Sequence, residues 1–392
     1  MLHALSGQRV FITGASGFIG GRLVERLAAD QQISIRALVR DFCHAGRLAR
    51  FPVEIVRGDV TDGAAVERAV EGADIIFHCA YGNSGDDAAR RSVNVGGTRN
   101  ILQAARTHKV RRIVHLSTIL VYGRTPDGPI DESAPRRTSD SVYADSKLEA
   151  EKLVFEFGSC HELPVTVLQP AEVYGPYATA WTQNVLRTLK ESRQILVDGG
   201  GGFANPVYID DLIDAMLLAA VKPEAVGEAF IIGAAAPVTW KEFYGAFERM
   251  LGTEATVCLS CAEARALYRS TQRCSRSFWH EAGSILFTEP AARSRVLKSR
   301  EARFARRTAA LLPANVRGAV KHWLRRWEHG AAVPSRGIKP VRVLDPLLLH
   351  LAARKTVFGI AKARRLLGYE PRFSFAEGMR RTEQWARWAN LI

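Results

Sequence analysis

The chain has no hydrophobic run long enough to cross a membrane, and we expect no secretory signal. A spanning helix needs roughly 18 to 20 apolar residues. The apolar stretch Ala215 to Val221 directly follows a group of aspartates that includes Asp214, so we expect a buried helix face there. The first strand is expected near Arg9, too close to the start for a signal peptide. We therefore predict a cytoplasmic protein. Any association with a membrane is expected to be contact with the membrane surface.

The cysteines show no spacing that is typical of a disulfide framework. Cys258 and Cys261 form a C-x-x-C pair, but a structural zinc site needs four ligands. Only Cys274 and His280 lie nearby, and no second pair has metal-ligand spacing. We predict reduced structural thiols, as is usual in the cytosol, and no metal site. The cysteines are Cys43, Cys79, Cys160, Cys258, Cys261 and Cys274.

Excess positive charge is confined to one segment. The 392 residues carry a formal net charge of +14, and residues 261–345 hold 18 lysines and arginines against six aspartates and glutamates. The rest of the chain is therefore close to neutral, which argues against a general nucleic-acid-binding surface. No base-reading module is recognisable either, so nucleic acid is not an expected partner.

Short apolar runs alternate with helical stretches over the first 170 residues. The runs are apolar almost continuously, which is typical of strands covered by helices on both faces. Strands are predicted at 10–12, 33–39, 53–56, 74–80, 112–116, 164–168 and 229–232, helices at 18–29, 64–70, 94–107, 181–191 and 373–388, and a turn or loop at 199–202. This rhythm predicts an α/β fold: a doubly wound parallel sheet (Rossmann) with a smaller C-terminal substrate-binding lobe.

The rhythm loosens after Tyr174-Gly175-Pro176, which suggests a division of the chain. We predict a dinucleotide-binding domain at 1–175, to which 205–235 returns. The substrate-binding lobe then comprises 176–204 and 236–392, including a basic insertion at about 261–345.

A glycine-rich turn follows the first predicted strand and opens a helix. Gly14, Gly17 and Gly20 permit a tight turn, close approach of the backbone to a pyrophosphate, and close helix packing. The phosphates of a dinucleotide then lie at the helix N-terminus, where free N–H groups favour anions. About twenty residues later come Arg40 and Asp41. An arginine there favours the 2′-phosphate of NADP and an acid favours NAD, so both cofactors stay open and NADP is preferred.

A series of motifs resembles the extended short-chain dehydrogenases, the NAD-dependent epimerase/dehydratase family. The resemblance covers the whole chain except the basic segment. In chain order the motifs are the glycine turn, Gly58-Asp59-Val60-Thr61-Asp62, His78-Cys79-Ala80, Asn94-Val95-Gly96-Gly97-Thr98, Ser117-Thr118 to Gly123, Tyr143-x-x-x-Lys147, Pro170 to Pro176, Asp210-Asp211 and Lys362 to Pro371.

Tyr143 and Lys147 are the predicted catalytic pair. Residues at i and i+4 share one helix face, so the ammonium of Lys147 is expected near the phenol and should lower the pKa of Tyr143 from about 10. Tyr143 would then act as general acid or base during hydride transfer. The resemblance implies that Lys147 also holds the nicotinamide ribose and that Thr118 hydrogen-bonds the reacting oxygen, with Ser117 as the second choice.

The resemblance also implies a set of cofactor contacts. Asp59 and Val60 match the family's adenine contacts, and Ala80 and Asn94 match contacts around the pyrophosphate and ribose. The full predicted set is Gly14, Ser16, Gly17, Phe18, Ile19, Gly20, Arg40, Asp59, Val60, Cys79, Ala80, Asn94, Ser117, Tyr143, Lys147 and Pro170. Members of the family often dimerise through the helices that carry Asn94 and Tyr143, so a homodimer is a further expectation.

The chain departs from the family pattern where substrates are selected. Ile119-Leu120 replace the Asp-Glu pair of the sugar dehydratases, which argues against dehydration. Ala204-Asn205-Pro206 replace an arginine that holds a diphosphate in the epimerases, while Gln169 and Glu172 stand where arginine and asparagine are common. A carboxylate near a diphosphate is repelled unless it is paired, so these departures argue against a sugar-nucleotide substrate. The alternative is that arginines of the basic segment replace the missing arginine.

Three hypotheses for the function follow. The first is an NAD(P)-dependent oxidoreductase or epimerase acting on a nucleotide-sugar or glycoconjugate precursor. The alternative is an NADPH-dependent reductase or dehydrogenase of a less charged ketone or alcohol, as in the flavonoid and sterol branches. The third, from another class, is a dinucleotide-binding regulator without catalysis, which the intact Thr118, Tyr143 and Lys147 disfavour.

The basic segment has a helical pattern at 314–327. Trp323 and Trp327 fall on one face, and Arg317 and Arg325 on another. Such a helix can lie on anionic lipid, which predicts peripheral membrane contact through 293–327 or binding of a lipid-linked substrate. The alternative is a helix docked on the substrate lobe with its basic face in solvent.

Overall fold

The structure, a computed structural model, describes residues 2–82, 85–139, 141–275 and 339–392. The predicted membrane contact at 293–327 lies outside these residues. Within the described parts, no helix combines the length and the apolar character that crossing a bilayer requires.

A seven-stranded parallel sheet forms the centre of the molecule, which confirms the predicted fold class. Its strand order is β11-β7-β5-β4-β1-β2-β3, and neighbouring strands pair in parallel, for example Thr13 of β1 with His78 of β4. The strands are β1 (Arg9–Thr13), β2 (Ser34–Val39), β3 (Val53–Arg57), β4 (Ile75–His78), β5 (Arg112–Leu116), β7 (Val165–Pro170) and β11 (Ala229–Ile232).

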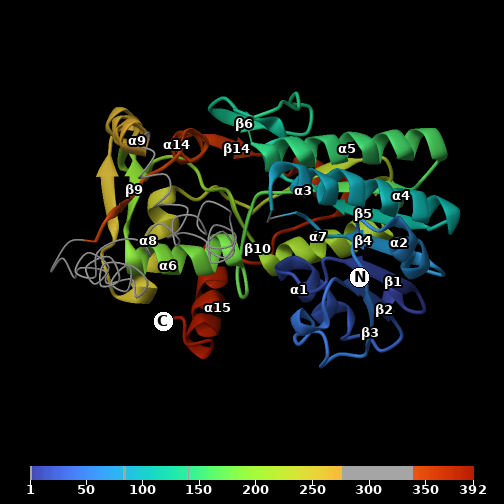
Figure 1. The fold of residues 1–392 in the computed structure, drawn as a ribbon. Helices are drawn as coiled ribbons and strands as arrows, with labels where there is room; N and C mark the ends of the chain where they lie inside the picture. Colours follow the sequence, from blue (N-terminus) through green and yellow to red (C-terminus); the bar gives the residue numbers. More distant parts are fainter. Residues whose placement is uncertain (1, 83–84, 140, 276–338) are drawn as a thin grey trace, which may run out of the picture.

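Helices cover both faces of this sheet (Figure 1). Along β1, Val10 and Ile12 belong to one buried cluster with residues of α1 and α7, while Phe11 belongs to another with residues of α2, α4 and α5. This two-sided burial explains why the strands are apolar without alternation. The helices are α1 (Phe18–Leu27), α2 (Gly63–Val70), α3 (Asp87–Arg91), α4 (Gly97–Thr107), α5 (Val142–His161) and α7 (Ile209–Val221).

The predicted helices differ from the observed ones mainly at their ends. The helix expected at 94–107 begins as a π-helical turn, η3 (Ser92–Gly96), before α4, and the one expected at 181–191 is η5 (Thr179–Gln183) followed by α6 (Asn184–Glu191). The predicted glycine loop at 199–202 is partly a short 3₁₀ turn, η6 (Asp198–Gly200). Other short turns are η1 (Leu2–Leu5), η2 (Phe42–His44), η4 (Ile119–Tyr122), η7 (Pro223–Ala225) and η8 (Ala363–Leu367).

A smaller lobe lies beside the main sheet, at the left of Figure 1. Its parallel sheet has the order β12-β9-β13, with β9 (Arg193–Val197), β12 (Thr256–Leu259) and β13 (Val341–Arg342). Ile195 and Val197 of β9 pack against Ala264 of α9 (Cys261–Ser275) and Leu349 of α14 (Pro346–Ala353). The lobe also contains α6 and α8 (Trp240–Leu251).

Two short strand pairs join distant parts of the chain. Strand β8 (Glu172–Tyr174) pairs with β10 (Pro206–Tyr208), and β6 (Gly128–Ile130) pairs with β14 (Thr356–Phe358). After them comes α15 (Phe375–Trp388). The predicted division at 175, 205 and 235 stays a prediction. It requires residues 205–235 to return to the first domain, and β11 within this range does lie at the edge of the main sheet.

Candidate active site

The glycine turn between β1 and α1 packs directly on the end of β4. Gly14 has a φ of +65°, and a Cβ at this position would lie 2.8 Å from the Ala80 nitrogen and from the Cys79 carbonyl. A Cβ at Gly20 would overlap the Gly14 carbonyl. Both positions therefore require glycine, and Cys79 and Ala80 are placed beside the turn.

The first turn of α1 has the features of an anion site. Its N-cap residue, Gly17, provides no side-chain acceptor for the free N–H groups, which a pyrophosphate would satisfy. Ser16 and Gly17 are exposed, while Phe18 and Ile19 are partly buried at the start of α1. These predicted residues fit a dinucleotide at this edge of the sheet.

The ends of β2 and β3 carry the residues expected near the adenosine. Arg40 is exposed, whereas the Asp41 carboxylate accepts a hydrogen bond from the Cys43 nitrogen at 3.1 Å. Asp59 likewise accepts from the backbone and the side chain of Thr61, and Val60 is buried. Arg40 is thus open to solvent while Asp41 is engaged with its own turn.

A chain of hydrogen bonds runs from the glycine turn to α4. Thr13 Oγ1 accepts from Ala80 N at 3.2 Å and lies 2.7 Å from His78 Nδ1, to which it donates because the proton of the neutral ring is on Nε2. The Thr98 hydroxyl donates to the Asn94 carbonyl at 2.6 Å, so His78 Nε2 donates to Thr98 at 3.0 Å. His78 is therefore a neutral Nε2–H tautomer, and burial lowers its pKa to about 3.

The buried Asn94 side chain continues this chain to the catalytic helix. Its Oδ1 accepts from Gly82 N at 2.8 Å and its Nδ2 donates to Ser146 Oγ at 2.8 Å. The Ser146 hydroxyl in turn donates to the Tyr143 carbonyl at 3.0 Å. The amide of Asn94, predicted as a ligand contact, thus joins the segment after β4 to the turn that carries Tyr143.

Lys147 and Tyr143 lie on α5, but the ammonium does not act on the phenol as predicted. The Lys147 Nζ donates to the Leu116 carbonyl at 2.8 Å. Burial, with a smaller contribution from Tyr81, raises the pKa of Tyr143 to about 12, while the Thr118 side chain opposes the rise. The predicted lowering of this pKa was therefore wrong, because i, i+4 spacing gives proximity along a helix and not the degree of burial.

Burial also affects the charge of Lys147. It lowers the pKa of Lys147 to about 8, while Cys79 and Glu151 act in the opposite direction. The ammonium is therefore the main form at neutral pH and is lost above about pH 8.

The two hydroxyls at the end of β5 have different surroundings. The Ser117 hydroxyl donates to Glu151 Oε2 at 2.6 Å, and Glu151 also accepts from Gln169 and pairs with Arg136. Thr118 instead interacts with the Tyr143 phenol. Glu151 was not predicted from the sequence, although it lies four residues after Lys147 and thus on the same helix face.

A buried ion pair lies just beyond Pro170, the last residue of β7. Arg354 Nη2 donates to Glu172 Oε1 at 2.9 Å, and both side chains are almost completely buried, with 1% and 4% exposed. Burial raises the pKa of Glu172 to about 7, although Arg354 opposes the rise. The sequence had pointed to the basic insertion for an arginine that replaces the diphosphate-binding arginine of the epimerases. Arg354 lies outside that insertion, and no predicted motif includes it.

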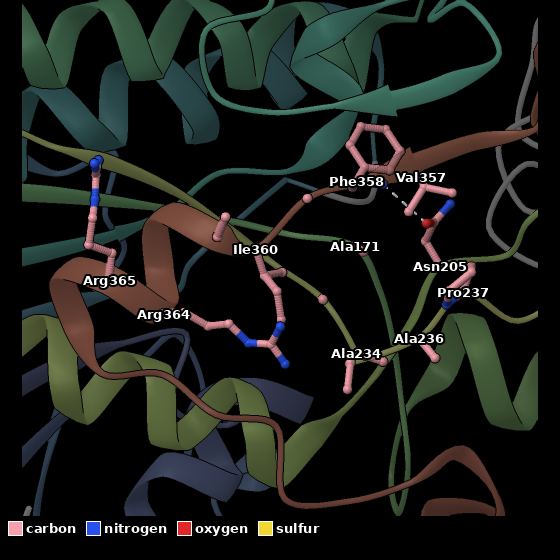
Figure 2. Close-up of a pocket in the computed structure, with 14 residues that line it drawn as sticks. Ala171, Asn205, Ala234, Ala236, Pro237, Val357, Phe358, Ile360, Arg364 and Arg365 are labelled. Atoms are coloured by element: carbon pink, nitrogen blue, oxygen red, sulfur yellow. Dashed lines mark hydrogen bonds between the residues drawn. The ribbon is translucent and has the colours of Figure 1, made fainter.

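A hollow of about 560 Å³ begins at Ala171, the residue before Glu172 (Figure 2), and its lining contains neither member of the pair and none of the predicted catalytic residues. Ala171 and Phe358 line it, as does Asn205, which bonds the backbone of β14. Arg364 extends from η8 toward the loop that carries Ala234. The hollow therefore follows the carboxyl ends of β7 and β11, beside the catalytic end of the sheet.

The described cysteines are free thiols. Cys43 Sγ lies 3.2 Å from His44 Nδ1, and the ligand atoms of Asp41, Cys43 and His44 lie within 4.8 Å of one another, all exposed. Slight desolvation and Asp41 raise the pKa of the Cys43 thiol, which disfavours the thiolate that a metal needs. We assign no metal to this triplet. The side chains of Cys274 and His280 lie outside the described residues.

Comparison with known proteins gives the family. The model of the NAD dependent epimerase/dehydratase family matches residues 10–233. A 4-hydroxy-2-methyl-3-oxo-4-farnesyl-3,4-dihydroquinoline-1-oxide ketoreductase of Stigmatella aurantiaca is 31% identical over 64% of this chain and 75% of its own. A 3 beta-hydroxysteroid dehydrogenase/Delta 5-->4-isomerase of Mycobacterium tuberculosis is 27% identical over 95% of this chain and 88% of its own.

A solved structure shows the same fold. The UDP-glucuronic acid 4-epimerase of Bacillus cereus in complex with NAD superposes with a TM-score of 0.65 at 18% identity, covering 97% of this chain and 99% of that one. The predicted resemblance and the prediction of an enzyme are confirmed. Since the family model covers more than half of the sequence, the chain belongs to the NAD dependent epimerase/dehydratase family.

Proposed function

We propose that the protein is an NAD(P)-dependent oxidoreductase in which Tyr143 is the general acid–base of hydride transfer. The observation that carries this proposal is the arrangement at the end of β5, where Thr118 interacts with the phenol and the buried Lys147 is held by the Leu116 carbonyl. With a pKa of about 12, Tyr143 is protonated at neutral pH. It is therefore poised to donate a proton to an oxygen that becomes an alkoxide.

The same edge of the sheet would hold the cofactor, which supplies or accepts the hydride. Gly14, Gly17 and Gly20 with the start of α1 would seat the pyrophosphate. Asp59 and Val60 would lie at the adenine, and Lys147 at the nicotinamide ribose. Among relatives of known structure the B. cereus epimerase binds NAD. We still favour NADP, because Arg40 is exposed whereas Asp41 is engaged by the Cys43 nitrogen.

Two substrate classes are compatible with this chemistry. A nucleotide-sugar or glycoconjugate precursor is supported by the fold, which the B. cereus sugar-nucleotide epimerase shares over nearly its full length. A less charged ketone or alcohol is supported by the ketoreductase and the hydroxysteroid dehydrogenase among the relatives. The steroid enzyme aligns with 95% of the chain, including the C-terminal part that carries Arg354.

Tyr143→Phe tests the assignment of the acid–base group. We expect kcat to fall by about 10²- to 10⁴-fold, with binding of NADPH unchanged, because only the proton donor is removed. Tyr268→Phe, on α9 in the other lobe, is the matched control and should keep full activity. Unchanged turnover in Tyr143→Phe would remove Tyr143 as the acid–base group, whereas absence of turnover in the parent protein would favour a non-catalytic regulator.

Native mass spectrometry of freshly purified protein then separates the two reaction types. Tightly retained dinucleotide indicates an epimerase, which returns the hydride to its own substrate and need not release the cofactor. Empty protein that binds NADPH reversibly indicates a reductase. The same spectrum gives the oligomeric state, and therefore tests the proposed homodimer through the helices of Asn94 and Tyr143.

A further inference from the structure

The Glu172–Arg354 pair has unused hydrogen-bonding capacity. Only one contact joins the two side chains, between Arg354 Nη2 and Glu172 Oε1. Glu172 Oε2 and the Nε and Nη1 of Arg354 are buried without a protein partner. Leaving charged polar atoms buried and unpaired is costly, so such atoms in a folded protein call for a partner from outside the chain.

The pair also occupies the place where a ligand is expected. In open α/β sheets, ligands bind beyond the carboxyl ends of the strands, and Glu172 is two residues past the end of β7. The guanidinium of Arg354 lies 5.0 Å from the Phe358 ring, which lies 6.2 Å from the ring of Tyr122. Tyr122 ends η4, the turn that begins after Thr118. The pair is thus linked to the turn after Thr118 through the packed rings of Phe358 and Tyr122.

Above the pKa of Glu172, which is about 7, the charges of the pair cancel, and this decides what kind of ligand suits the pair. A diphosphate would bind an arginine whose charge is free, but Arg354 is already neutralised by Glu172, and the carboxylate would repel a second anion. A hydroxyl or carbonyl group carries no charge and can both accept from the free Arg354 nitrogens and, as a hydroxyl, donate to Glu172 Oε2.

We propose that Glu172 and Arg354 form a substrate-selecting subsite that binds an uncharged hydroxyl or carbonyl group and excludes a diphosphate. The inference rests on the proposed function and narrows its substrate class to the less charged ketones and alcohols. The neighbouring hollow agrees with it, since Ala171, Val357 and Phe358 offer apolar walls to the body of such a molecule.

Glu172→Gln tests the exclusion of diphosphate, because it leaves the charge of Arg354 free. At pH 8.5, well above the pKa of about 7 for Glu172, we expect this variant to bind uridine diphosphate about tenfold or more tightly than the parent. Calorimetry measures this without any turnover. Glu156→Gln, an exposed glutamate of α5, is the matched control and should bind as the parent does. Tight binding of uridine diphosphate by the parent, or weaker binding by Glu172→Gln, would overturn the proposal.

A double variant, Glu172→Leu with Arg354→Met, guards against misfolding of the single one, because well-packed apolar residues can replace a buried ion pair without loss of stability. It should not gain affinity for uridine diphosphate. With cyclohexanone as a neutral probe ketone, we expect its KM to rise about tenfold with kcat little changed, since binding and not proton transfer is affected. An unchanged KM would count against the subsite.

The two proposals can fail separately. If Tyr143→Phe keeps full turnover, the catalytic proposal is rejected, regardless of the affinity for uridine diphosphate. If Tyr143→Phe is inactive while the parent binds uridine diphosphate tightly, the oxidoreductase stands and the selecting subsite is rejected.

Discussion

Single residues at the β1–α1 turn have no room for substitution. We expect Gly20→Ala to lower the free energy of unfolding by about 1–3 kcal/mol, because its Cβ would overlap the Gly14 carbonyl. Relieving the overlap moves the turn and should abolish binding of the dinucleotide. Urea unfolding and NADPH titration measure the two effects. Gly46→Ala is the control, since nothing lies near its added Cβ; equal losses in both variants would contradict the explanation.

Some site residues could be predicted from the sequence and others could not. Gly14, Tyr143 and Lys147 were recognisable because each belongs to a motif whose members lie within a few positions of one another, where spacing determines geometry. Arg354 was not, because its contact with Glu172 spans 182 positions, and nothing local distinguishes it from other arginines. The wrong expectation for the pKa of Tyr143 has the same origin: burial depends on segments distant in sequence.

At the scale of elements, we expect α5 to make activity depend on pH. Lys147, with a pKa of about 8, is charged below that pH and neutral above it, while Tyr143 stays protonated. If the ammonium is needed, kcat for ketone reduction should be level from pH 6 to 8 and fall above it by up to about tenfold per pH unit. A pH–rate profile measures this break.

The groups around Lys147 provide the control for this prediction. Glu151 and Cys79 favour the charged amine, while His78 and His115 are kept neutral by burial. Glu151→Gln removes the negative charge and should therefore move the break to lower pH. A break that stays in place in this variant would mean that another group titrates.

The elements of the main sheet were predictable because two-sided burial leaves long apolar runs. The short strands were missed for the opposite reason. Strands β6, β8 and β14 have three residues each, too few to show a period, and their pairing depends on contacts between distant segments. These short strands are the ones that bring Asn205 and Glu172 to the site.

At the scale of the whole molecule, the charge distribution predicts a surface interaction. Residues 261–345 carry nearly all of the net charge of +14, and the helical pattern at 314–327 places tryptophans opposite arginines. We expect the protein to float with vesicles that contain phosphatidylserine at low salt, and to be released at about 0.5 M salt because the attraction is screened. A variant with Arg317, Lys321 and Arg325 changed to Gln should stay at the bottom of the gradient.

Absence of flotation by the parent protein at low salt would exclude the membrane and favour the alternative, a helix docked on the substrate lobe. Vesicles of phosphatidylcholine alone are the control for adsorption that does not depend on charge. Binding to these neutral vesicles would show that the tryptophans, and not the arginines, carry the interaction.

The late position of Arg354 has a consequence for how the protein is made. Ribosomes add about 5–20 residues per second, so Glu172 leaves the ribosome roughly ten to forty seconds before its partner is available. Asp214 pairs with the earlier Arg26, but its second partner, Arg372, lies 158 positions later. A nascent chain therefore cannot form the Glu172–Arg354 pair until Arg354 has been synthesised. In a product truncated before Arg354, the Glu172 carboxylate would be buried without a partner, or the region around it would stay open. Cellular quality control can recognise either state.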